Sequence, residues 1–215
     1  MDLDLVDPLD PDAYYTSARA YLRRAREALR KKDVRNLFYA AFELRCCVEA
    51  RQLEYADALV KLQGKKIRAW KISETYNAIQ ANSGNGKIVQ MQFRQSANTF
   101  DLFHVPVSVN LKSSAEKLGD FLHAREAMFR VGSTEHERLL AHVIETYRLS
   151  WLCCKGDALV PPLFANDSHE IHPLRIELDQ EIREKLSDFC LDEGSEVEFQ
   201  VKYLDEPPAD WIAEF

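Results

Sequence analysis

Long apolar runs are missing from this 215-residue sequence. No stretch approaches the roughly 18–20 apolar residues that a membrane-spanning helix needs. The acidic first segment, MDLDLVDPLDPDAYY, lacks the basic and apolar regions of a signal peptide. We therefore expect a cytoplasmic protein that has no membrane partner.

Cysteine is also scarce, and the spacing of its residues fits neither a CxxC motif nor a secreted disulfide framework. The five cysteines form two adjacent pairs and one single residue, Cys46-Cys47, Cys153-Cys154 and Cys190. No two have CxxC spacing, and an odd number in this pattern excludes a disulfide framework of the secreted kind.

Motifs of the common cofactor and metal classes are absent too. The sequence holds no GxxxxGK[ST], GxGxxG, HExxH or GxSxG. Cys153, Cys154, His169 and His172 are four residues that could bind zinc. However, structural zinc pairs usually have two to four residues between them, and these cysteines are adjacent. We expect no metal and no cofactor.

Charge is unevenly distributed along the chain, whose net charge is −7. Between Ala13 and Phe100, 17 Lys and Arg outnumber 7 Asp and Glu, whereas from Asp157 to Phe215 16 acidic residues outnumber 4 basic ones. The two regions could attract each other, bind different partners, or simply be two solvated surfaces. RNA is a possible partner of the basic region, and another protein of the acidic region.

Two long amphipathic helices are predicted first. Apolar residues recur at three and four residues from Tyr14 to Leu29, after the helix-start signal Asp10-Pro11-Asp12. A basic turn follows, with Asp33 as a plausible N-cap, and a second helix runs as far as Leu62. A short polar turn between two long helices predicts an antiparallel hairpin.

Further helices are predicted after an excursion at 82–111. There the alternating residues 89–94 and the Val-rich stretch 103–109 favour the two strands of a small hairpin, the second of which Pro106 weakens. Ser113 and Ser114 begin the next helix, Gly132-Ser133 interrupts the pattern, and a last long helix ends at Gly156.

The fold class that follows is mainly α, an antiparallel helical bundle with a small α+β C-terminal appendage. We assign 1–156 to the bundle with its excursion, and 157–215 to a small acidic α+β region. That region contains one predicted helix at 178–189 and the clearest strand pattern of the chain at 197–203.

Arg130 and His136 are the candidate catalytic residues. They have five residues between them in RVGSTEHERLLAH, residues 130–142. Histidine can move a proton near neutral pH, and arginine can hold a phosphate in a two-pronged fork. The alternative reading makes His136 a solvated first-turn residue beside a Ser or Thr cap.

Two other polar sets lie inside helical patterns. Arg45 and Glu49 have the i,i+4 spacing of an ion pair, which we favour over a role in a site. His123 lies on an apolar helix, where a hydrogen-bonded core histidine is expected.

The hairpin EALRKKDVRNLFYAAFELRCCVEA and the later helices resemble the HEPN superfamily over residues 13–155. Nuclease members carry an arginine and a histidine with four to six residues between them near the start of a late helix, and Arg130 and His136 have five between them. Val131 stands where those members often have a polar residue. The resemblance implies a bundle that dimerises and brings two such pairs into one cleft.

Two functions follow as expectations. The first is a HEPN-like, metal-independent endoribonuclease, such as a toxin or defence effector, that acts as a homo-oligomer through Arg130 and His136. The second is a non-catalytic protein–protein interaction module of a multi-component system.

Overall fold

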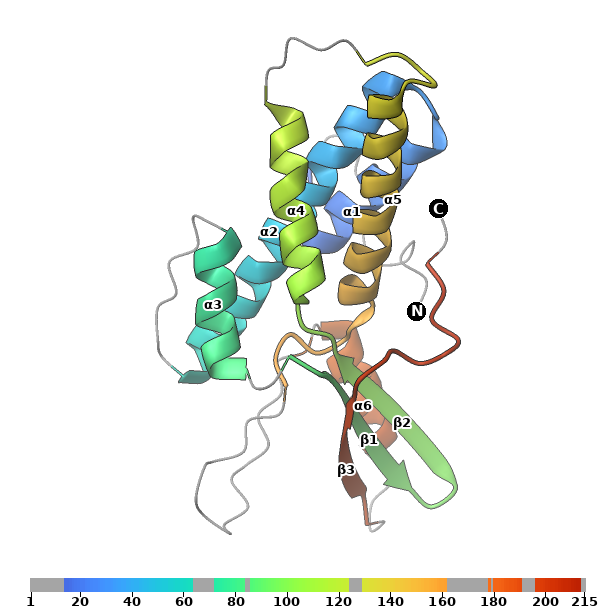
Figure 1. The fold of residues 1–215 in the computed structure, drawn as a ribbon. Helices are drawn as coiled ribbons and strands as arrows, with labels where there is room; N and C mark the ends of the chain where they lie inside the picture. The colour runs from blue at the N-terminus through green and yellow to red at the C-terminus, as the bar shows by residue number, and fades with distance from the viewer. Residues whose placement is uncertain are drawn as a thin grey trace.

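A bundle of helices with a three-stranded antiparallel sheet at one end forms the described part of the chain (Figure 1). The computed structural model describes residues 14–63, 72–83, 86–123, 129–161, 178, 180–190 and 196–213. The elements are α1 (Ala18–Arg30), α2 (Val34–Gln63), α3 (Ile72–Ser83), β1 (Ile88–Gln95), β2 (Asn98–His104), α4 (Val109–Leu122), α5 (Thr134–Lys155), α6 (Gln180–Cys190) and β3 (Glu198–Leu204). The predicted fold class is confirmed. Within these ranges, no helix has the length and apolar character needed to cross a membrane.

α1 begins at Ala18, later than the start near Tyr14 that the periodicity predicts. That prediction is wrong because Ser17 provides the cap. Its backbone is extended and its hydroxyl accepts a hydrogen bond from the Ala20 amide at 3.2 Å. Tyr14 instead lies against Arg24, whose guanidinium carbon is 4.0 Å from the ring centroid. The predicted start signal at 10–12 lies outside the described residues.

The turn between α1 and α2 and the length of α2 are as predicted. Asp33 caps α2, because its Oδ1 accepts a hydrogen bond from the Asn36 amide at 2.8 Å. The helix then runs uninterrupted to Gln63. α1 and α2 therefore form the expected antiparallel hairpin, and α3, α4 and α5 pack against α2.

The main core lies where α4 and α5 pack against this hairpin, and Figure 1 shows α4 and α5 as neighbours in front of it. Buried side chains from all four helices meet there, including Leu22, Leu29, Leu37, Leu44, Leu118, Leu139, Val143 and Tyr147. A second cluster joins α3 to the later half of α2 and to the start of α4, with Tyr55, Leu59, Ile79 and Leu111 among its members.

α4 starts at Val109 and not at Ser113, so this predicted boundary is wrong as well. Ser108 has an extended backbone, and its hydroxyl accepts a hydrogen bond from the Leu111 amide at 3.1 Å. Ser114 lies inside the helix, where its hydroxyl is 2.9 Å from that of Thr146 on α5. Its polar group joins two helices and does not cap one.

The sheet combines a hairpin in the excursion with the C-terminal strand. The first strand of the hairpin is where the sequence predicts it, but the second is Asn98–His104 and not the Val-rich stretch 103–109, so that boundary is wrong. β1 pairs with β2 and also with β3, both in antiparallel register, and the strand order is β2-β1-β3. Pro106 lies beyond the last residue of β2 and so removes no hydrogen bond from the ladder. α6 covers one face of the sheet through Ile182, Leu186 and Phe189. The excursion and the C-terminal region are therefore parts of one sheet.

Gly156 ends α5, as the sequence predicts, but its conformation is not left-handed. Its φ of −64° and ψ of 135° are open to any residue. The need for glycine is steric, because a Cβ there would lie 2.9 Å from the Val105 nitrogen and 3.2 Å from the Phe103 carbonyl oxygen. The close approach brings the end of α5 against the end of β2, where Phe103 O accepts hydrogen bonds from the Asp157 and Ala158 amides.

Gly156→Ala should destabilise the protein by about 1–3 kcal/mol, because backbone atoms must move to admit the methyl group. Gly119→Ala is the matched control. Its methyl group would meet only the terminal atoms of the Arg45 side chain, and alanine favours a helix interior by about 1 kcal/mol over glycine. Urea denaturation measures both free energies of unfolding. A Gly156→Ala cost no larger than that of Gly119→Ala would contradict the steric account.

Candidate functional site

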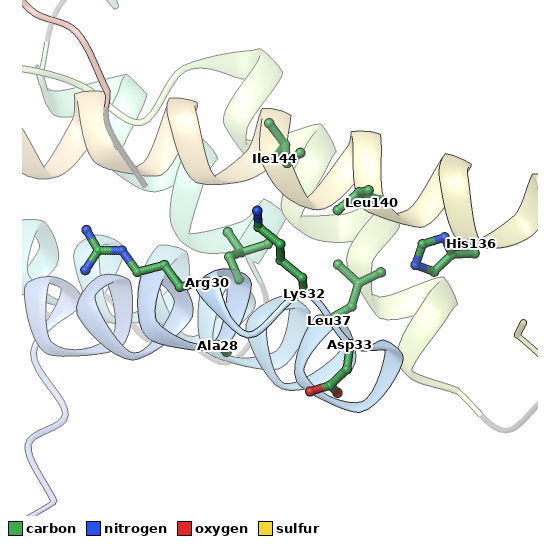
Figure 2. A pocket seen from close by; sticks show the side chains of 9 residues that line it. Ala28, Arg30, Lys32, Asp33, Leu37, His136, Leu140 and Ile144 are labelled. Carbon is green, nitrogen blue, oxygen red and sulfur yellow. The ribbon is translucent and has the colours of Figure 1, made fainter. Parts of the chain in front are cut away.

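A pocket of about 540 Å³ lies between the α1–α2 turn and the first turns of α5 (Figure 2). α5 contributes His136, Leu140 and Ile144, which are four residues apart and therefore share one helix face. The other wall comes from the end of α1, the turn and the start of α2, with Ala28, Leu29, Arg30, Lys32, Asp33 and Leu37. The pocket thus has apolar walls and an imidazole at one end. Lys32 is directed toward α5, whereas the Arg30 guanidinium is directed away from the other labelled side chains (Figure 2).

His136 is buried at this pocket, with 8% of its surface exposed. Its amide donates to the hydroxyl of Ser133, the N-cap of α5, at 3.2 Å. Its ring nitrogen Nδ1 lies 3.4 Å from the Gly132 amide nitrogen and 3.2 Å from Glu137 Oε1. Nδ1 can accept from the amide when it carries no proton and can donate to the carboxylate when it carries one. The ring therefore has a hydrogen-bond partner in either protonation state.

Arg130 opens the tight turn that leads into α5. Its carbonyl accepts a hydrogen bond from the Ser133 amide at 2.9 Å, and Gly132 occupies the third position with a φ of 80°. The left-handed φ at that position is typical of a type II turn and favours glycine. Arg130 is exposed and does not line the pocket. Ser133 is bonded both to the Arg130 carbonyl and to the His136 amide, but only the His136 side chain lines the pocket.

The prediction for His123 is wrong. The residue is the C-cap of α4, its side chain is exposed, and its amide donates to the Gly119 carbonyl. α4 ends at Leu122, so the apolar helical pattern does not extend to His123 and does not bury its side chain. Arg45 and Glu49, by contrast, form the expected i,i+4 ion pair, with 3.1 Å between Arg45 Nε and Glu49 Oε1.

Cys153 and Cys154 are buried at the end of α5, and the Cys154 sulfur lies 3.8 Å from that of Cys47 on α2. His169 and His172, the other two residues considered for zinc, lie outside the described residues. In the portion of the chain that the structure describes, no three His, Cys, Asp or Glu side chains are grouped to hold a metal ion.

A buried polar network around Arg51 was not predicted. The guanidinium donates to the Tyr55 hydroxyl at 3.0 Å, to Glu54 at 3.1 Å, and to the carbonyls of Cys153 and Gly156 at 3.1 and 2.9 Å. Arg51 is only 3% exposed. In the sequence, Arg51 is a charged residue that interrupts an apolar helical pattern. This interruption was the one sign that its side chain could be buried.

His104 and Cys153 belong to the same buried region. Nδ1 of His104 lies 3.0 Å from the Ala158 carbonyl oxygen, which can only accept, so Nδ1 carries the proton of the neutral ring. Burial raises the pKa of Cys153 to about 11, so that its thiol stays protonated and is a poor nucleophile. These residues support the fold, and neither lines the pocket beside His136.

Comparisons of the chain with protein families, with curated proteins and with solved structures gave no match. The pocket between the α1–α2 turn and α5 is therefore interpreted from its own residues.

His104 should make the protein less stable as the pH falls. Burial lowers its pKa to about 4, below the value of about 6.5 in the unfolded chain. Between these two pH values, His104 binds a proton in the unfolded chain but stays neutral in the folded protein. The free energy of unfolding therefore falls by up to about 3 kcal/mol as the pH drops from 6.5 to 4.

Denaturation curves from pH 7 to 4 for the wild type and for His104→Gln isolate this effect. Contributions of other groups cancel in the difference between the two proteins. The advantage of the wild type should shrink below pH 6.5, and a constant difference down to pH 4 would count against a neutral buried histidine.

Proposed function

We propose that the protein is a HEPN-like endoribonuclease that cleaves RNA without a metal ion, with Arg130 and His136 as its catalytic pair. The observation that carries the proposal is the place of His136. It is buried at a pocket toward which Lys32 extends, so a proton-transfer group lies beside a space that attracts phosphate.

The chemistry assigns a role to each residue. His136 removes the proton of an RNA 2′-hydroxyl, whose oxygen attacks the adjacent phosphorus. The bond from phosphorus to the 5′-oxygen breaks, and that oxygen takes up a proton from water. The products are a 2′,3′-cyclic phosphate and a 5′-hydroxyl, and the protonated His136 returns its proton to solvent. Arg130 is exposed on the turn before α5, where its guanidinium can hold a phosphate that projects from the pocket and stabilise the charge of the transition state.

A homo-oligomer forms part of the proposal, and the exposed face of α2 supports it. Tyr39, Phe42 and Leu53 are 57%, 50% and 46% exposed. Their spacing of three and eleven residues places them on one side of the helix. Burying this face against a second copy would remove apolar surface from water.

The same apolar face favours the alternative function, a non-catalytic protein–protein interaction module. Apolar side chains at helical spacing are also how a helix binds a different protein. In that case the net charge of −7 would disfavour RNA, and His136 would serve only to fix the start of α5. The two functions differ in whether RNA is cleaved.

His136→Ala should lower the rate of RNA cleavage at least about 100-fold, since it removes the group that accepts the proton. Arg130→Ala should lower it by about 100-fold or more, through lost stabilisation of the transition state. The measurement is cleavage of a fluorescent RNA in the presence of EDTA, followed by identification of the product ends.

Two matched variants control for loss of a histidine and of an arginine at other exposed positions. His123→Ala and Arg138→Ala should retain wild-type cleavage, because both residues are exposed and neither lines the pocket. Cleavage that persists in both catalytic variants would remove Arg130 and His136 from the mechanism. Wild-type protein that leaves RNA intact while Phe42→Glu abolishes its association with a copurifying protein would favour the interaction module.

A further inference from the structure

Lys32 has a backbone conformation that lysine rarely adopts. It follows Lys31, the C-cap of α1, and its amide donates to the Leu29 carbonyl at 3.2 Å. Its φ is 54°, the left-handed conformation that normally selects glycine or asparagine at the residue after a helix. Glycine would adopt this turn at lower energy. The lysine at position 32 is therefore more easily explained by a function of its side chain than by folding.

The side chain of Lys32 reaches the pocket. Figure 2 shows it extended toward α5, while the carboxylate of Asp33 is directed to the opposite side. Asp33 bonds instead to the amide of Asn36. No hydrogen bond or ion pair joins Lys32 Nζ to any residue in the described ranges, so its charge remains available to a ligand.

The walls next to this cation are apolar. Leu29 and Leu37 lie on one side, with Leu140 and Ile144 on the other. A pocket of about 540 Å³ has the size of a small-molecule site. An apolar slot with a cation at its rim is complementary to a nucleobase and its phosphate.

We propose that this pocket holds one unpaired nucleotide of an RNA strand, with its base between the apolar walls and its phosphate on Lys32. The inference rests on the proposed function and adds to it a binding site for one nucleotide of the RNA. A base in a duplex is stacked and paired, and it would have to leave the helix before it could enter.

Lys32→Gly is a suitable test because it separates folding from binding. Glycine removes the cation and also suits the left-handed backbone, so the variant should have the same or a higher melting temperature. Lys31→Ala is the matched control, since Lys31 is a neighbouring lysine with an ordinary φ of −76° that does not line the pocket. The probe is a short single-stranded RNA whose 2′-oxygens are methylated, so that it cannot be cleaved.

Lys32→Gly should weaken binding of this RNA about tenfold at low salt and reduce the slope of log K against log salt by about one phosphate contact. Lys31→Ala should change the affinity less than twofold. A duplex of the same sequence should bind the wild type at least about tenfold more weakly. Equal losses in the two lysine variants, wild-type binding by Lys32→Gly, or equal affinity for the duplex would each overturn the proposal.

The assay also distinguishes this proposal from the proposed function. Binding that depends on Lys32, with no cleavage of unmodified RNA, would retain the nucleotide site and reject the nuclease. Cleavage that depends on His136 but is unaffected by Lys32→Gly would retain the nuclease and reject the nucleotide site. Failure of the wild type to bind single-stranded RNA would reject both.

Discussion

The arrangement of the bundle depends on the hydrogen bonds that the buried Arg51 guanidinium donates. The guanidinium bonds within α2 to Glu54 and Tyr55, and across to the Cys153 and Gly156 carbonyls at the C-terminal end of α5. A cation is favourable there because the last carbonyls of a helix lack intrahelical partners and carry partial negative charge. Arg19 of α1 donates to the Cys154 and Gly156 carbonyls as well. Two arginines therefore attach the end of α5 to both helices of the hairpin.

This attachment also explains how the sheet meets the bundle. Tyr55 donates its hydroxyl hydrogen to the Val105 carbonyl just after β2, and the absence of a side chain at Gly156 lets the chain after β2 approach the end of α5. The opposite end of α5, about 30 Å away for a helix of this length, carries His136 beside the α1–α2 turn. One end of the helix is thus used for attachment, and the other lines the pocket.

Much of the helical architecture could be predicted because local chemistry decides it. Asp33 caps α2, Gly132-Ser133 precedes α5, and the alternation at 197–203 forms a strand, all as the residues suggest. Local chemistry failed where two capping signals competed. Ser17 and Ser108 cap α1 and α4, although the sequence also offers Asp10-Pro11-Asp12 and Ser113-Ser114 as start signals. His123 was misplaced for the related reason that α4 ends there.

By itself, the sequence determined the mainly α class, the long hairpin, the C-terminal strand and the place of His136 in the first turn of α5. These features depend on residues that are neighbours along the chain. The tertiary structure alone decided that β3 joins the hairpin of β1 and β2, that Arg51 is buried against the end of α5, and that Lys32 and His136 share a pocket. Each of these brings together residues roughly a hundred apart, and such pairings depend on the shape and burial of complete elements rather than on any local pattern.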